Sequence, residues 1–503
     1  MTSRLQGLCT KAAVILAATL VGVLSGHGPA RAENDRIRLG MVLEPPHLDP
    51  TAGAAAAIDE VVYANVFEGL TRIDRDGVVQ PALAESWVVS DDGLTYRFTL
   101  RDGATFHDGS EFEADDVVFS FERAMAEDST NAQKGLFEPI DKVTADGSHQ
   151  VTVTLKRPTG HFLFNLGWGD AVIVAPESAA DNKATPVGTG PFKFDRWVKG
   201  DRIELVRYDD YWGEPVRLAR ATFQIVPDPA AAMAAMMAGD LDAFPNFPAP
   251  ENMAQFERDP RFTVKIGTTE GETILAINNG RPPLDDLRVR RAIAHAIDRE
   301  AIIDGAMFGY DTPIGSHFAP HHPAYVDLTG VYPHDPEKAR ALLAEAGYRD
   351  GLRLTLKLPP PSYARRGGEI IAAQLAEVGV AVEIIPVEWA QWLEQVFKGK
   401  DYDLTIVSHT EPMDIEIYSR GSDYYFDYQK PEFKALIETL AETTDQNARN
   451  QILADAQRML AEDSVNAFLF QLAKHGVWNA RLEGLWENSP VQANDLTEVH
   501  WTD

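Results

Sequence analysis

Four histidines lie close together in one proline-rich stretch of the sequence, between residues 312 and 336. They are His317, His321, His322 and His334. Imidazole is the commonest side-chain ligand for transition metals, so a group of this kind suggests a metal site. Their spacing is not that of a ligand pair fixed on one helix, and a solvated loop explains the same residues. The sequence therefore assigns no metal ligand and leaves metal binding by this loop open.

The residue patterns of common enzymes are missing. The sequence contains no G-x-x-x-x-G-K-[ST] phosphate loop, no G-x-S-x-G nucleophile elbow and no H-E-x-x-H zinc motif. Among 76 acidic residues, pairs of carboxylates arise by chance. We therefore expect no catalytic residue, no cofactor and no enzymatic activity, and a secreted hydrolase is the disfavoured alternative.

Strands and helices alternate in the second half of the chain, which predicts a mixed α/β region. Alternating apolar runs predict strands at 37–42, 96–100, 151–155, 352–356, 380–385 and 404–407. Helical spacing of apolar residues predicts helices at 54–70, 114–126, 287–303, 335–346, 369–378, 431–441 and 447–462. Asp146-Gly147, before the strand at 151–155, is a favourable hairpin turn.

The first 32 residues have the pattern of a secretory signal peptide. Basic residues precede an apolar run of about 13 residues, too short for a membrane span of about 20, and Ala30-Arg31-Ala32 fits the cleavage site. Cys9, the only cysteine, lies inside this segment and before the apolar run. An exported protein without cysteine avoids mispairing in an oxidising compartment, so we expect a soluble periplasmic protein released after Ala32.

Length and charge set broad limits. A chain of 503 residues exceeds the size of one core, which predicts two or three domains. The net charge is −30 and becomes more negative when the signal peptide is removed. Such a charge repels nucleic acid and anionic membranes, so we expect neither as a partner.

Several ordered motifs are specific enough to suggest a family. Residues 80–87, 91–96, 100–109 and 114–117 form the clearest run, which includes Gln80-Pro81-Ala82-Leu83-Ala84-Glu85-Ser86-Trp87. Val187-Gly188-Thr189-Gly190-Pro191-Phe192 and Tyr211-Trp212-Gly213 follow, and further motifs begin at Asp286 and Asp335. Together they resemble the extracellular solute-binding proteins of family 5, which include dipeptide-, oligopeptide- and nickel-binding proteins of ATP-binding cassette importers.

The resemblance implies an α/β, bilobal periplasmic binding protein fold of type II, in the large peptide-binding class, with an extra inserted domain. By analogy, residues 33–62, 182–272 and 476–503 form lobe I, residues 63–181 the extra domain, and residues 273–475 lobe II. Ligand binding would close the two lobes around a cleft, because the ligand contacts both lobes only in the closed state.

The resemblance also implies where a ligand would bind. Similar dipeptide binders place an acidic residue just after a strand to pair with the peptide amino group, and here Glu411 takes that position, with His409 close to it. The same proteins carry an arginine before the Ala364-Arg365-Arg366 stretch, whereas residues 358–363 contain none. A standard dipeptide grip is therefore not expected, unless Arg365 or Arg366 compensates.

Aromatic and amide side chains complete the candidate ligand-binding residues, because such groups line concave sites. We select Trp168, Trp389, Trp392, Tyr425 and Asn279. Core packing is the alternative role for the aromatic residues, and a turn is the alternative role for Asn279.

These observations predict a monomeric periplasmic binding protein of an ATP-binding cassette importer. It would capture a peptide or another amine-bearing small molecule and deliver it to a cognate permease and ATPase. A metal chelate, favoured by the histidines, and an oligosaccharide, favoured by the tryptophans, are the alternative ligands. A chemoreceptor-linked sensor would have the same sequence features.

Overall fold

A mixed sheet of eleven strands runs through the described part of the computed structural model, which covers residues 35–53, 55–410 and 414–502. The predicted signal peptide and Glu411 lie outside these residues. The strand order is β15-β14-β16-β12-β17-β11-β1-β10-β9-β8, and β13 pairs with β17. In chain order the strands are β1 (Arg36–Met41), β8 (Phe192–Val198), β9 (Arg202–Arg207), β10 (Arg220–Ile225), β11 (Ala243–Phe244), β12 (Phe262–Ile277), β13 (Thr312–Pro313), β14 (Leu352–Leu358), β15 (Val380–Pro386), β16 (Leu404–His409) and β17 (Asn466–Asn479).

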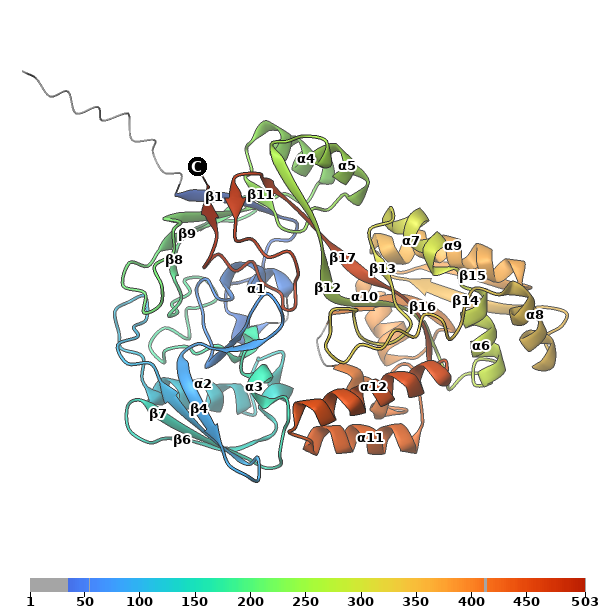
Figure 1. Cartoon of the computed structure of the whole chain (residues 1–503), viewed down its shortest axis with the longest axis horizontal. Coiled ribbons are helices and arrows are strands. Elements are labelled where there is room, and N and C mark those ends of the chain that lie inside the picture. The colour runs from blue at the N-terminus through green and yellow to red at the C-terminus, as the bar shows by residue number, and fades with distance from the viewer. Residues whose placement is uncertain (1–34, 54, 411–413, 503) are drawn as a thin grey trace, which may run out of the picture. The chain divides into compact units, whose positions relative to one another are not determined.

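Two long strands, β12 and β17, connect the two ends of this sheet. They pair antiparallel from Phe262 opposite Asn479 to Ala276 opposite Asn466, with a bulge between Thr268 and Glu272. Figure 1 shows them running side by side from the region of β1, β8 and β9 to the region of β14, β15 and β16. The sequence did not predict either strand.

A separate antiparallel sheet has the order β4-β5-β7-β6. Its strands are β4 (Ala84–Val89), β5 (Thr95–Leu100), β6 (Ile140–Ala145) and β7 (Gln150–Leu155). The predicted turn at Asp146-Gly147 joins β6 to β7, and Gly147 has a φ of 94°, which suits glycine. Two short pairs complete the strands: β2 (Thr71–Ile73) with β3 (Val79–Pro81), and β18 (Leu482–Glu483) with β19 (His500–Trp501).

The helices follow most of the predicted periodicity. They are α1 (Ala56–Val62), α2 (Ala114–Met125), α3 (Phe162–Asn165), α4 (Pro229–Ala238), α5 (Met253–Glu257), α6 (Leu287–Ala296), α7 (Arg299–Met307), α8 (Pro336–Glu345), α9 (Ser362–Glu377), α10 (Trp389–Trp392), α11 (Pro431–Glu442) and α12 (Gln446–Glu462).

Three predicted helices have the wrong bounds. The helix predicted over 287–303 is two helices, because Ile297 is extended and the Asp298 carboxylate caps α7 by accepting the Ala301 amide. The helix predicted over 54–70 ends at Val62, where the chain turns through Ala64 with a φ of 57°. The helix predicted from 369 begins seven residues earlier, at Ser362.

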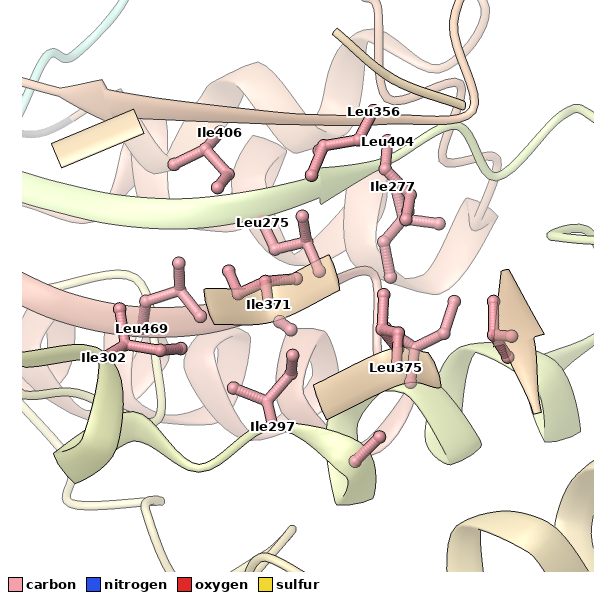
Figure 2. Close-up of a cluster of buried hydrophobic side chains, with 14 of the residues drawn as sticks. Leu275, Ile277, Ile297, Ile302, Leu356, Ile371, Leu375, Leu404, Ile406 and Leu469 are labelled. Carbon is pink, nitrogen blue, oxygen red and sulfur yellow. The ribbon is translucent and has the colours of Figure 1, made fainter. Parts of the chain in front are cut away.

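Buried apolar side chains form several distinct clusters. One cluster packs α6, α7, α8 and α9 against the sheet, and Figure 2 shows part of it. Its labelled members include Leu275, Ile277 and Leu404 from the sheet and Ile302 and Ile371 from the helices. Other clusters lie within residues 70–175 and around β1, β9 and β10. The predicted domain boundaries remain a prediction.

Two of the sequence motifs meet on one buried carboxyl group, that of Glu68. Thr189 and Trp212 donate hydrogen bonds to Oε2 at 2.9 and 2.8 Å, and Tyr211 donates to Oε1 at 2.9 Å. Burial raises the pKa of Glu68 to about 7, although the three donors oppose the shift. These motifs thus act as scaffold, because they satisfy a polar group that the fold encloses.

Replacing Glu68 tests this account. A carboxyl pKa raised from 4.5 to about 7 makes the folded state lose stability as the pH rises through that interval. Between pH 5 and pH 8 the unfolding free energy of the wild type should fall by up to about 3 kcal/mol more than that of Glu68→Gln, which has no carboxyl group to titrate at this position. Urea unfolding at both pH values measures this difference. An equal fall in both proteins would contradict the assignment.

Candidate functional site

A cavity of about 810 Å³ lies in the described part of the chain, and this volume is ample for a small organic solute. Its walls come from residues 132–168 on one side and 392–441 on the other. Four of the seven predicted ligand-binding residues line it: Trp168, Trp392, His409 and Tyr425. The structure thus brings together residues that are far apart in the sequence.

Aromatic rings form much of one wall. The rings of Trp392 and Tyr425 meet edge to face at 5.7 Å, and Phe397 contacts both Tyr424 and Tyr425. Trp392 is buried, and its Nε1 donates to Thr405 Oγ1 at 2.9 Å, which fixes the ring. Such rings offer a flat apolar surface with polar edges.

A chain of acidic and histidine side chains lies beside this wall. Asp414 begins the short helix η6 (Asp414–Arg420), and its Oδ1 lies 2.7 Å from His317 Nε2. Its Oδ2 lies 3.3 Å from His409 Nδ1, and His409 Nε2 is hydrogen-bonded to the Tyr425 hydroxyl at 2.9 Å. Glu272 Oε1 lies 3.2 Å from the same nitrogen of His317.

Electrostatics keep Asp414 ionised. Burial by itself raises the pKa of this carboxyl, but the neighbouring imidazoles of His317 and His409 outweigh burial and hold the pKa below its usual value. An anionic group therefore borders the cavity.

The predicted histidine group does not act as one unit. His317 is fully buried against Asp414, and His321 pairs with Glu270 at 2.6 Å. His322 stacks on Phe318 with ring centroids 4.1 Å apart, and burial lowers its pKa to about 3. His334 lies elsewhere, 3.5 Å from Asp298.

Charged residues of both signs also border the cavity. Arg157 and Arg420 supply cations, and Glu138 and Glu416 supply anions. Arg420 lies 3.4 Å from Glu416, and both side chains are about half exposed. Arg157 lies 3.7 Å from Glu138, so both guanidinium groups have carboxylate partners. The sequence did not single out Arg157 or Arg420, which have no distinctive local motif.

A second cavity, of about 570 Å³, contains the predicted residue Trp389. Pro360 and Pro361, from the segment that lacks the expected arginine, line it together with Glu60 and Lys474. Lys474 is buried and donates to the carbonyls of Trp486 and Asn488 at 3.0 and 3.3 Å. Burial lowers its pKa to about 8.

Lys474 was missed in the sequence, although a lysine inside the apolar stretch 467–478 is a signal for a special role. Neither arginine proposed to compensate lines either of these two cavities. Arg365 lies 3.3 Å from Glu388, and the Arg366 guanidinium lies over the Phe308 ring.

Asn279 has a scaffold position. It is buried, and its Nδ2 donates to the carbonyls of Ile277, Phe426 and Val465 at 2.9, 3.2 and 3.0 Å. It does not line either cavity described above. Its amide links three segments near the end of β12, and its predicted contact with a ligand stays a prediction.

A concave site with aromatic walls and charges of both signs, on a mixed α/β fold, is typical of solute-binding proteins. The model of the bacterial extracellular solute-binding proteins, family 5 middle, matches residues 78–414. The chain belongs to this family, and it is a solute-binding protein of an ATP-binding cassette importer. Members of the family are not enzymes, in agreement with the sequence prediction.

Individual relatives differ in what they bind. The chain is 32% identical over 432 residues to the dipeptide-binding protein of Escherichia coli, covering 77% of this chain and 79% of that protein. It is 33% identical over 356 residues to heme-binding protein A of Haemophilus influenzae, covering 64% of each. Family membership therefore does not fix the solute.

Solved structures confirm the fold. The ABC transporter substrate binding protein CtaP from Listeria monocytogenes matches with a TM-score of 0.84 at 24% identity, covering 94% of this chain and 100% of that chain. The expected bilobal α/β periplasmic binding protein fold is thereby confirmed. Among the described residues, no helix combines the length and apolar composition that a membrane span requires.

Substituting Asn279 separates its scaffold role from the predicted ligand contact. Asn279→Ala removes three hydrogen bonds from buried carbonyls and should lower the unfolding free energy by about 1–3 kcal/mol, measured by chemical denaturation. The affinity for the solute identified by mass spectrometry or calorimetry should be unchanged. Loss of solute at unchanged stability would instead place Asn279 in the binding site.

Proposed function

We propose that this protein captures a short peptide or another amine-bearing small molecule in the periplasm and delivers it to a cognate permease and ATPase. The observation that carries the proposal is the 810 Å³ cavity, whose aromatic walls border carboxylates and guanidinium groups. Aromatic rings take the apolar part of such a solute, and the charged groups take its charged ends.

The two charged ends of a peptide have candidate partners in this chain. A ligand ammonium group would pair with Glu411, which follows β16 in the sequence and lies outside the described residues. Asp414, three positions further along the chain, is an ionised group that borders the cavity. A ligand carboxylate would pair with Arg157 or Arg420, since guanidinium groups bind carboxylates in a two-pronged geometry. Either arginine would exchange its present partner, Glu138 or Glu416, for the ligand carboxylate, and would thus take the place of the arginine missing from residues 358–363.

Closure of the cavity would follow from ligand contacts on both sides. Under the proposed division, lobe I comprises residues 33–62, 182–272 and 476–503, the extra domain 63–181, and lobe II 273–475. Both boundaries between the lobes then fall inside β12 and β17, which would serve as the hinge. Under this division the two walls of the cavity belong to the extra domain and to lobe II. A solute that contacts both walls would hold these two parts together and shift the population toward the closed form.

Native mass spectrometry of the protein purified without refolding is the direct test. Denaturation should release a peptide or another amine, which tandem mass spectrometry then identifies. A released metal chelate or sugar would overturn the proposal in favour of that solute class.

If the protein is empty, calorimetry with a dipeptide, its N-acetylated form and its C-terminal amide should show that blocking the amine weakens binding most. Equal affinity for the dipeptide and both blocked forms would argue against a site that recognises the amino group.

Neutralising Glu411 tests the amine contact directly. Glu411→Gln should weaken binding of the identified amine by about 10–100-fold, because a charged hydrogen bond contributes about 1.5–3 kcal/mol. Glu394→Gln is the matched control, because Glu394 is exposed, lies near Lys398 and borders neither cavity described above. Unchanged affinity in Glu411→Gln, measured by calorimetry, would show that Glu411 does not read the ligand.

A further inference from the structure

Three metal-ligating side chains converge in the interior next to the cavity. A carboxylate oxygen of Glu272, a ring nitrogen of His317 and a carboxylate oxygen of Asp414 all lie within 4.8 Å of one another. The His317 side chain is fully buried, and those of Glu272 and Asp414 are 4% and 13% exposed. Among the described residues, this is the one such group of three.

Three separate elements bring these donors together. Glu272 follows the bulge in β12 and lies directly opposite His409 of β16. His317 comes from the loop after β13, and Asp414 is the first residue of η6. β-bulges are common beside binding sites, because they re-aim a side chain without ending the sheet.

We propose that Glu272, His317 and Asp414 bind one divalent first-row transition metal ion. The donors would be Nε2 of His317 and one oxygen of each carboxylate. One imidazole with two carboxylates suits zinc, nickel, cobalt or manganese, whereas calcium and magnesium favour sites built from oxygen alone.

Charge balance supports an ion at this position. Two carboxyl groups converge in a buried place, where uncompensated negative charge is costly. A divalent cation bound between them would balance the charge of both carboxylates.

Neighbouring groups hold the donors in place. His409 lies 3.3 Å from Oδ2 of Asp414, so Oδ1 is left facing His317, and Tyr425 in turn fixes His409. The ring of Tyr418 meets that of His317 edge to face at 5.2 Å. Partners of this kind orient metal ligands and tune their affinity.

The ion would lie at the wall of the cavity, because Asp414 and His409 both line it. Three protein ligands leave a coordination position open, which is the arrangement of zinc sites that act on bound molecules. A solute carboxylate, amine or water molecule would complete the shell. The metal site itself does not depend on which solute the cavity takes, so metal alone is the probe.

Cobalt binding provides the test. Protein stripped with a chelator and dialysed is titrated with Co²⁺ and Zn²⁺, with absorption spectroscopy and calorimetry as readouts. We expect one Co²⁺ to bind per chain and to give visible absorption bands typical of imidazole and oxygen ligands. Adding Zn²⁺ should displace the Co²⁺ and remove these bands. His317→Gln and Glu272→Gln should each weaken binding by more than about 100-fold, which exceeds the usual effect of losing an outer partner.

His321→Gln is the matched control, because it removes the nearby His321–Glu270 pair and leaves the three donors intact. It should bind cobalt like the wild type. Circular dichroism checks the fold of each variant. If either His317→Gln or Glu272→Gln does not fold, the cobalt affinity of the other variant provides the test. Absence of saturable cobalt binding by the wild type would overturn the proposal and leave the three side chains as a buried ion-pair network. Equal binding by His317→Gln and wild type would overturn it as well.

Discussion

The antiparallel pairing of β12 with β17 is the constraint on which the rest of the structure depends. Through these strands one sheet continues from β8 to β15, so both ends share one hydrogen-bonded frame. The same strands carry Glu272 and Lys474, each of which lies next to a cavity. Because register fixes which face each side chain of a strand occupies, this pairing sets where both residues lie.

Burial of charge is the second recurring feature, and the fold satisfies each case differently. Glu68 receives three hydrogen bonds and has a raised pKa, whereas Asp414 lies between two imidazoles and has a lowered one. Lys474 donates to two carbonyls. Glu68 is tied to motifs of the scaffold, whereas Asp414 and Lys474 border open cavities. Proximity to a cavity, more than burial, therefore separates candidate binding groups from structural ones.

Local sequence patterns predicted the elements well where the pattern itself is the cause. The Pro336 start of α8 and the Asp146-Gly147 turn follow from fixed backbone preferences, and both appear as expected. The errors arose where a local interaction interrupts a continuous apolar pattern, as at the Asp298 cap. The strands β12 and β17 were missed because their residues are stabilised by pairing partners about 200 positions away, which no local period records.

The sequence by itself determined the family, the α/β class and most of the short elements, since motif order and residue periodicity are properties of the chain. It also indicated seven candidate ligand-binding residues, of which Trp168, Trp392, His409 and Tyr425 line one cavity. Only the tertiary structure decided that Trp389 borders a different cavity, that Asn279 supports the backbone, and that His317 joins Glu272 and Asp414. The physical reason is that a side chain's partners depend on sheet register and loop packing, which bring together residues more than a hundred positions apart.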